Sequence, residues 1–117
     1  METVKLFDAE WNLMEIVWEN APTTASRIAA IAGQRFCWAK NTTYTVLKRL
    51  IGKGVIQRSG ADFTVTPLVT RRQVQISEIN AAMEKLFGGS VAEMFAALLQ
   101  EGCISREERE ALRTLLE

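Results

Sequence analysis

The sequence predicts a mainly α-helical chain with one small β-hairpin, and three observations support this fold class. Apolar residues recur at helical spacing in residues 8–19, 40–53 and 71–87. A short stretch at 55–66 alternates between apolar and polar residues around a central turn. The chain has 117 residues, of which 48% are hydrophobic and 24% charged, and this suits one compact domain or one small domain with an appendage.

The first expected helix runs from residue 8 to residue 19. Asp8 can cap it, because an Asp side chain accepts hydrogen bonds from the free N–H groups of the first turn. Its apolar stripe has helical spacing and should face the core. The stripe consists of Trp11, Met14, Val17 and Trp18.

The second expected helix covers about residues 24–32, after a turn. Thr23 or Thr24 caps it, and Gly33 ends it, because glycine readily adopts the left-handed conformation that follows a helix. A loop at 34–39 then leads to the third helix.

The third expected helix covers about residues 40–53 and is followed by Gly54, which suits a left-handed end. Its first turns are rich in threonine, although β-branched residues lower helix stability. One side has the spacing of a core-facing stripe. This stripe consists of Thr43, Val46 or Leu47, and Leu50.

A β-hairpin follows, with strands at 55–59 and 62–66, a turn at Gly60-Ala61 and Pro67 at its end. Phe63 and Val65 should share one face of the second strand, because side chains two residues apart point to the same side. Three short helices followed by a hairpin is the order of a winged helix-turn-helix domain. We assign this domain to residues 1–72.

The rest of the chain predicts three more helices. The first covers about residues 71–87 and is capped by Thr70, the second is capped by Ser90, and the third begins with a capping box at Ser105. We assign residues 73–117 to a separate helical region. Short helices this rich in apolar residues should form a dimerisation region, or else fold back on the N-terminal domain. The candidate dimerisation residues are Ile79, Met83, Leu86, Val91, Met94, Phe95, Leu98, Leu99, Leu112 and Leu115.

Charge is divided unevenly along a chain whose net charge is zero. Residues 1–72 carry ten Lys and Arg against six Asp and Glu, and residues 73–117 carry four against eight. No acidic residue lies between Glu19 and Asp62. A span with basic residues and no acidic ones indicates a surface that binds a polyanion. The alternative is an ordinary solvated surface that happens to lack acidic residues. Its basic residues are Arg27, Arg35, Lys40, Lys48, Arg49, Lys53 and Arg58.

The outward face of the third helix should carry groups that read DNA. Asn can pair with adenine, Thr can hydrogen-bond a base and contact the thymine methyl, and Lys and Arg suit guanine or phosphate. The N-terminal residues of such a helix enter the major groove first. The alternative is that a threonine-rich helix start serves only as a cap region. The candidate DNA-binding residues are Asn41, Thr42, Tyr44, Thr45, Lys40, Lys48, Arg49, Lys53 and Arg58.

Three further features leave two readings each. The hairpin tip at 58–62 can lie along the phosphate backbone, although its Asp62 would face like charge. Arg71 and Arg72 either contact phosphate or only begin a basic helix. Trp38 either packs the loop or approaches the DNA backbone, whereas the other two tryptophans and Phe36 should belong to the core.

The composition argues against several function classes. The chain has no histidine, so the commonest general base and metal ligand are missing, and we expect no enzyme, metal or cofactor. Cys37 and Cys103 should be reduced, partly buried thiols. Since we find neither a membrane-spanning run nor a signal peptide, we expect a cytoplasmic protein without a membrane partner.

Four segments carry a resemblance to a known family, and they are AEWNLMEIVW (9–18), APTTASRIA (21–29), WAKNTTYTVLKRLIGKG (38–54) and VTPLVTRR (65–72). Together they resemble the penicillinase-repressor family. They occur in the family's order and spacing, and the match covers most of residues 6–72. The C-terminal half matches more loosely, through residues 88–90 and 104–117.

The resemblance implies a homodimeric transcriptional repressor that binds an inverted-repeat operator of antibiotic-resistance or stress genes. By motif position the family's base-contacting residues fall on Thr42 and Tyr44, and many relatives have a basic residue in place of this Tyr44. In antibiotic-responsive members a sensor protease relieves repression by cleavage in the dimerisation region, which corresponds here to Phe95–Leu99. The copper-responsive branch carries a C-terminal cysteine cluster, but this chain has only Cys103 there.

Two other function classes remain as alternatives. A winged-helix module can bind another protein without recognising a DNA sequence. A small enzyme is disfavoured, because neither histidine nor a paired-carboxylate motif is present.

Overall fold

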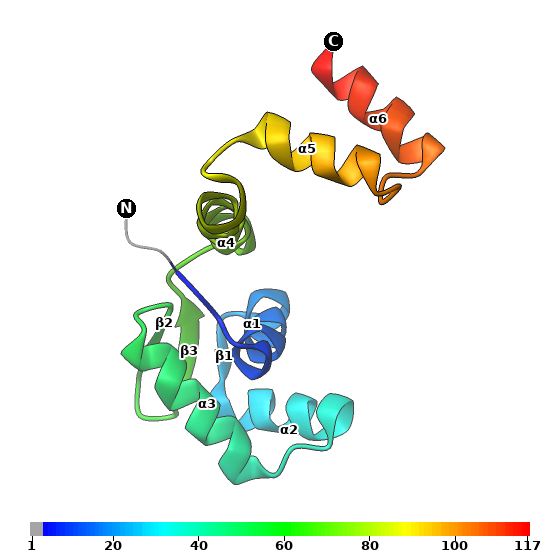
Figure 1. The fold of residues 1–117 in the computed structure, drawn as a ribbon. Helices are drawn as coiled ribbons and strands as arrows, with labels where there is room; N and C mark the ends of the chain where they lie inside the picture. Colours follow the sequence, from blue (N-terminus) through cyan, green and yellow to red (C-terminus); the bar gives the residue numbers. More distant parts are fainter. Residues whose placement is uncertain (1–3) are drawn as a thin grey trace. The chain divides into compact units, whose positions relative to one another are not determined.

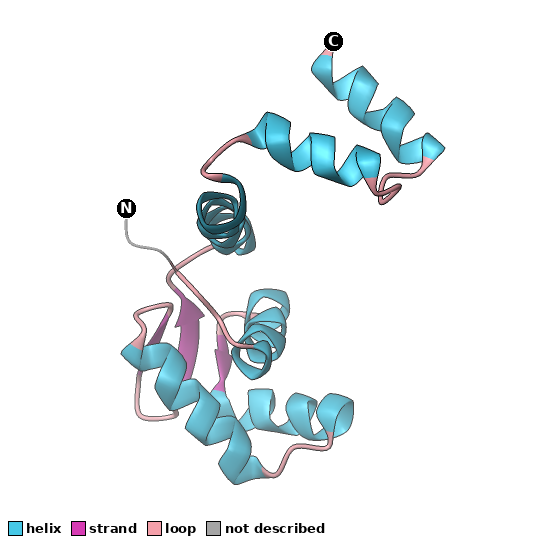
Figure 2. Ribbon diagram, in the orientation of Figure 1, coloured by secondary structure: helices cyan, strands magenta, loops and turns pink. Residues whose placement is uncertain are grey.

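The computed structural model describes residues 4–117 and confirms a mainly helical chain with a small antiparallel sheet (Figures 1 and 2). The elements are α1 (Asp8–Asn20), β1 (Thr23–Thr24), α2 (Ala25–Phe36), α3 (Lys40–Gly52), β2 (Ile56–Ser59), β3 (Thr64–Pro67), α4 (Arg71–Phe87), α5 (Val91–Gln100) and α6 (Arg106–Leu116).

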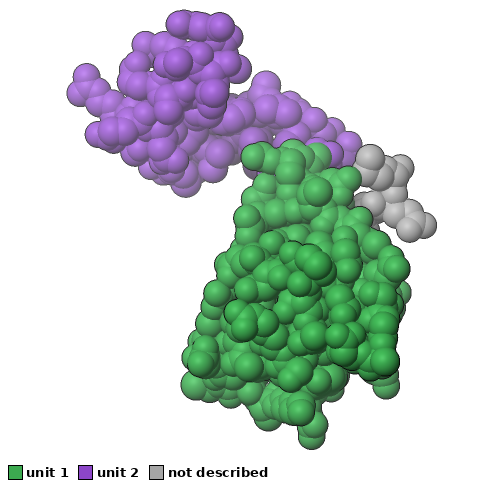
Figure 3. All heavy atoms as spheres, turned by 180° about the vertical axis from the view of Figure 1, so that it is seen from behind, with its two compact units in different colours: residues 1–77 green, residues 78–117 purple. Residues whose placement is uncertain are grey.

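The chain divides into two compact units, residues 1–77 and residues 78–117 (Figure 3). The division falls inside α4, so the first turns of this helix belong to the N-terminal unit and the rest to the C-terminal unit. No helix among residues 4–117 is long and apolar enough to cross a membrane.

The sheet has three strands in the order β1-β3-β2, and both pairings are antiparallel. The hairpin that the sequence predicts is present. For the residues of β1, however, the sequence predicts a turn and a helix cap rather than a strand. Strand β1 has two residues, which pair with Val65 and Thr64 of β3. A strand of two residues is too short to produce an alternating pattern, so only the pairing reveals it.

Most predicted helix caps are confirmed. Thr24 accepts a hydrogen bond from the N–H of Arg27, and Ser90 and Ser105 cap α5 and α6 in the same way. Thr70 accepts from the N–H of Gln73 while the Gln73 side chain accepts from the N–H of Thr70. Each bond satisfies an N–H group that has no partner within its helix.

The cap of α1 differs from the prediction. Phe7, not Asp8, is the N-cap residue, and Asp8 is already helical. The side chain of Glu10 turns back to accept a hydrogen bond from the N–H of Phe7 at 2.8 Å. Glu10 therefore makes the backward bond of a capping box to the N-cap residue, and Asp8 does not cap the helix.

Helix α2 is longer than predicted and continues through Gly33 to Phe36. It ends at Cys37, which adopts the left-handed conformation with φ of 58°. Contacts of the last turn explain the extension. Arg35 forms an ion pair with Glu19 at 2.7 Å, and the ring of Phe36 packs against Trp38. These contacts outweigh the preference of about 1 kcal/mol against glycine inside a helix.

Three smaller corrections concern exposed segments. Helix α3 ends at Gly52, one residue earlier than predicted, and Gly54 follows with φ of 76°. Phe63 lies in the hairpin turn with φ of 53°, so it does not belong to β3. Both cysteines are exposed free thiols rather than partly buried ones.

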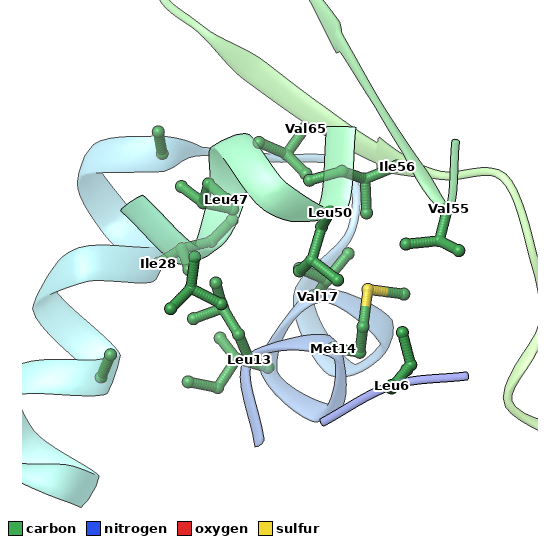
Figure 4. Packing of buried hydrophobic residues seen from close by; sticks show 14 of the residues in the cluster. Leu6, Leu13, Met14, Val17, Ile28, Leu47, Leu50, Val55, Ile56 and Val65 are labelled. Carbon is green, nitrogen blue, oxygen red and sulfur yellow. The ribbon is translucent and has the colours of Figure 1, made fainter. Parts of the chain in front are cut away.

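One hydrophobic core holds the N-terminal unit together (Figure 4). Leu13, Met14 and Val17 of α1 meet side chains from α2, α3 and the sheet. Trp11 and Trp18 lie half-buried at its edge, with ring centroids 5.5 Å apart in an edge-to-face arrangement. The other buried members include Ile28, Leu47, Leu50, Val55, Ile56 and Val65.

A charged pair lies at the border of this core. The Glu10 side chain is 1% exposed, and its Oε1 receives the ammonium of Lys53 at 2.5 Å. The same ammonium donates to the carbonyl of Lys5 at 2.9 Å and lies over the ring of Phe7. Glu10 Oε2 has no hydrogen-bond partner among the described residues. The pair ties the end of α3 to the start of α1.

Replacing Lys53 by Met should destabilise the N-terminal unit. The change removes the ammonium and leaves the Glu10 carboxylate buried without its counter-charge. We expect the free energy of unfolding to fall by about 3 kcal/mol, the lower end for a broken buried pair, because the Lys53 side chain is 32% exposed. Urea unfolding followed by tryptophan fluorescence measures this, since all three tryptophans lie in residues 1–77.

The control for this substitution is Lys48→Met, at an exposed position of the same helix. It should change the free energy of unfolding by no more than about 0.5 kcal/mol. Equal losses for the two variants would contradict the role given to the Glu10–Lys53 pair.

Replacing Thr43 by Val should stabilise the same unit. Thr43 is fully buried, and its hydroxyl has no hydrogen-bond partner within the described chain. Removing an unsatisfied buried hydroxyl should raise the free energy of unfolding by about 1 kcal/mol. Thr45→Val, at an exposed position, serves as the control and should change little. A loss of stability on Thr43→Val would instead mean that the hydroxyl has a bound partner.

Candidate nucleic-acid interface and apolar surface

Helix α3 separates its residues into two faces, as predicted. Its core-facing positions are all buried, and the polar positions between them are exposed or half-buried. The buried positions are Thr43, Val46, Leu47 and Leu50.

A hollow of about 400 Å³ lies between the outward face of α3 and the hairpin. Four predicted DNA-binding residues of α3 line it. Arg58 of β2 lines it too, although it lies ten or more residues after them in sequence. The lining consists of Asn41, Tyr44, Thr45, Lys48, Ile51, Arg58 and Phe63.

Other predicted DNA-binding residues do not line this hollow. Because successive helix residues are rotated by about 100°, Thr42 and Arg49 fall on the opposite flank of the outward face. Both are exposed. Lys40 begins α3, and its ammonium lies 5.9 Å from the centroid of the Tyr44 ring. The outward face of α3 is therefore wider than the hollow.

Aromatic rings connect the helix to the hairpin. The ring of Tyr44 meets the ring of Phe63 edge to face, with centroids 5.9 Å apart. The guanidinium carbon of Arg58 lies 3.9 Å from the centroid of the same Phe63 ring. Phe63 is absent from the sequence-predicted site, because the alternation of the hairpin assigned it to a strand face. Its aromatic side chain in a polar turn is the signal that could have identified it.

The hydroxyl of Thr45 already has a use inside the helix. It donates to the carbonyl of Asn41 at 2.9 Å. Such bonds to the preceding turn are common for threonine in helices. In this arrangement the oxygen can still accept a hydrogen bond, so Thr45 is suited to the amino group of adenine or cytosine.

Ion pairing divides the predicted basic residues into two groups. Arg35 pairs with Glu19, and this hydrogen bond holds the pKa of the Glu19 carboxyl below its ordinary value. Lys53 pairs with Glu10, so its ammonium is held at the start of α1, although the side chain is 32% exposed. Among the described residues, no carboxylate pairs with the other five, which are Arg27, Lys40, Lys48, Arg49 and Arg58.

Arg71 also has a structural partner. Its guanidinium binds both carboxylate oxygens of Glu15, at 3.2 and 2.6 Å, and lies over the ring of Trp18. The indole N–H of Trp18 donates to the carbonyl of Val69 at 2.9 Å. These contacts hold the start of α4 against α1, and Arg72 beside them is exposed.

The C-terminal unit presents a different surface. Neither α5 nor α6 contains a buried residue, and a hollow of about 600 Å³ is lined mainly by apolar side chains such as Phe95, Leu99, Leu112 and Leu115. Among the candidate dimerisation residues, Met83, Met94, Phe95, Leu98 and Leu112 are partly buried. The exposed ones are Ile79, Leu86, Val91, Leu99 and Leu115.

Comparison with protein families gives a match over nearly the whole chain. The family described as penicillinase repressor matches residues 6–117. The penicillinase repressor of Bacillus licheniformis is 24% identical over 115 residues, covering 97% of this chain and 90% of that protein. The methicillin resistance regulatory protein MecI of Staphylococcus aureus is 25% identical over 117 residues, covering 98% and 95%.

Solved structures with a similar fold come from the repressor BlaI. The solution structure of its DNA-binding domain has a TM-score of 0.55 at 24% identity, covering 60% of this chain and 88% of that one. The monomeric form of B. licheniformis BlaI in complex with the blaP half-operator has a TM-score of 0.52 at 25% identity, with the same coverage.

Proposed function

The chain belongs to the penicillinase repressor family, and on this basis we propose that it is a homodimeric transcriptional repressor that occupies an inverted-repeat DNA operator. The observation that carries the proposal is the outward face of α3, whose polar residues lie beside the hairpin and whose cations have no carboxylate partners among the described residues. The relative BlaI, solved in complex with a half-operator, supports DNA as the ligand. The protein would act on DNA in the cytoplasm.

We propose that α3 enters the major groove with its N-terminal end first, as recognition helices do. Asn41 and Thr42 then lie nearest the base edges. The amide of Asn41 suits adenine, and the hydroxyl of Thr42 suits either a donor or an acceptor on a base. Thr45 accepts from a base amino group, as its helical hydrogen bond dictates. The remaining proposed DNA-binding residues are Tyr44, Lys40, Lys48, Arg49 and Arg58.

The proposed dimer forms through residues 73–117, and residues 1–72 bind DNA. Its support is the exposed apolar surface of α5 and α6, which have no core of their own. Large exposed apolar side chains such as Leu115 and Leu116 favour coverage by a second copy of the chain. Joining two DNA-binding units raises their affinity for two half-sites without any new contact to DNA.

Repression in this proposal is simple occupancy of the operator, and the protein needs no catalysis. The proposed targets are antibiotic-resistance or stress genes, and two relatives named as a penicillinase repressor and a methicillin resistance regulatory protein support the first of these. Release by a sensor protease would require a cut in the region of Phe95–Leu99, which lies inside α5. A protease binds extended backbone, so α5 would have to unwind before cleavage.

The wild-type protein should bind duplex DNA with strong salt dependence. Each neutralised phosphate contributes a slope of about −0.9 to the plot of log affinity against log salt concentration. Lys48→Gln should lower the slope by about 1, whereas the control Lys85→Gln, in α4 of the C-terminal unit, should leave it unchanged. Fluorescence anisotropy over a series of salt concentrations measures this.

The main alternative function makes the opposite prediction. A winged-helix module that binds only proteins would show no salt-dependent affinity for DNA. Such a result with the folded wild-type protein would exclude the repressor proposal.

Leu115→Asp should convert the dimer to a monomer. Leu115 is 80% exposed, so the substitution adds a charge to the proposed interface with little effect on the fold of the single chain. Sedimentation velocity should show roughly half the mass, and DNA affinity should fall because two-site binding is lost. Phe95→Asp, inside the apolar hollow, should have the same effect.

The matched control is Thr114→Asp, on the polar side of α6, about 160° from the middle of its leucine face. It adds the same charge to the same helix and should leave the dimer intact. A dimer that survives Leu115→Asp would place the interface elsewhere.

A further inference from the structure

We infer that Phe63 and Tyr44 are positioning residues that hold the hairpin arginine, Arg58, at the DNA backbone. The inference rests on the proposed function and adds to it a role for two aromatic rings. It identifies Phe63, which no base or phosphate needs to touch, as a determinant of DNA affinity.

The side-chain contacts form a continuous row from the helix to the hairpin. The Lys40 ammonium, the Tyr44 ring, the Phe63 ring and the Arg58 guanidinium follow one another, with successive separations of 5.9, 5.9 and 3.9 Å to the ring centroids. Both ends of the row are cations, and both inner members are aromatic. A guanidinium stacked on a ring face keeps its N–H groups at the edge free to bind phosphate.

The backbone of Phe63 is fixed independently of its ring. Its carbonyl accepts a hydrogen bond from the N–H of Ala25 at 2.9 Å, at the start of α2. The next residue, Thr64, pairs with Thr24 in the sheet. Phe63 itself has φ of 53°, a conformation that a residue other than glycine keeps only when its surroundings impose it. The ring therefore has a fixed base on which Arg58 can stack.

The physical benefit is preorganisation. Arg58 is exposed and comes from β2, a strand at the edge of the sheet, so without the ring its long side chain would sample many rotamers. Stacking restricts these rotamers before DNA arrives, and the loss of freedom on binding becomes smaller. The Tyr44 ring packs edge to face against the Phe63 ring and so supports it from the helix side.

The experiment measures affinity and its salt dependence on a duplex that the wild-type protein has selected from a randomised pool. Arg58→Gln should lower the salt slope by about 1. Phe63→Leu should weaken binding about fivefold and lower the slope although Arg58 is still present. Phe63→Tyr, which keeps a ring, should restore both values.

The double variant Phe63→Leu with Arg58→Gln separates positioning from general damage. If the ring acts through the arginine, the double variant should bind no more weakly than Arg58→Gln alone, because the two effects are not additive. Additive losses would overturn the inference. If Phe63→Leu does not fold, Phe63→Met provides the same comparison, because it removes the ring and keeps an apolar side chain.

Phe7→Leu is the matched control. Phe7 also carries a cation over its ring, the ammonium of Lys53 at 4.5 Å, but it lies at the start of α1. Its substitution should leave affinity and slope unchanged. If wild type shows salt-dependent binding and Phe63→Leu retains the full slope, the positioning role is wrong and the repressor proposal stands. If wild type does not bind DNA, both fail.

Discussion

The burial of one face of α3 is the constraint on which the rest of the N-terminal unit depends. Val46, Leu47 and Leu50 join the core with side chains of α1, α2 and the sheet, so the rotation of α3 about its axis is fixed. The ion pair between Glu10 and Lys53 fixes the far end of the helix in addition. Because this face is buried, the polar residues between these positions lie on the opposite side of the helix and point outward.

Lysine and arginine residues of the N-terminal unit fall into two groups, those that pair with carboxylates and those that do not. Lysine and arginine occur throughout residues 27–58 without an intervening acid. Two of them, Arg35 and Lys53, turn to carboxylates that come from α1, earlier in the chain. Those on the outward side of α3 and on the hairpin pair with no carboxylate in the part of the chain that the structure describes. The positive surface is thus smaller than the count of basic residues indicates, and it is concentrated around α3 and β2.

The two units differ in how their apolar residues are used. In the N-terminal unit, α1, α2, α3, the start of α4 and the sheet enclose a core of buried side chains. In α5 and α6 no residue is buried, although these helices are rich in leucine and phenylalanine. Two short helices cannot surround a core, because too few neighbours are available to cover each apolar side chain. This contrast is the physical basis for proposing that the C-terminal unit associates with a second copy.

The sequence by itself determined the order of the helices and hairpin, most of their caps and the division of α3 into two faces, because local spacing and capping chemistry specify these features. The tertiary structure alone decided the extension of α2 past Gly33, the strand pairing of Thr23 and Thr24, and the ion pair of Lys53 with Glu10. It also brought Phe63 and Arg58 beside Tyr44. Each of these depends on a partner distant in sequence, and periodicity carries no information about such partners.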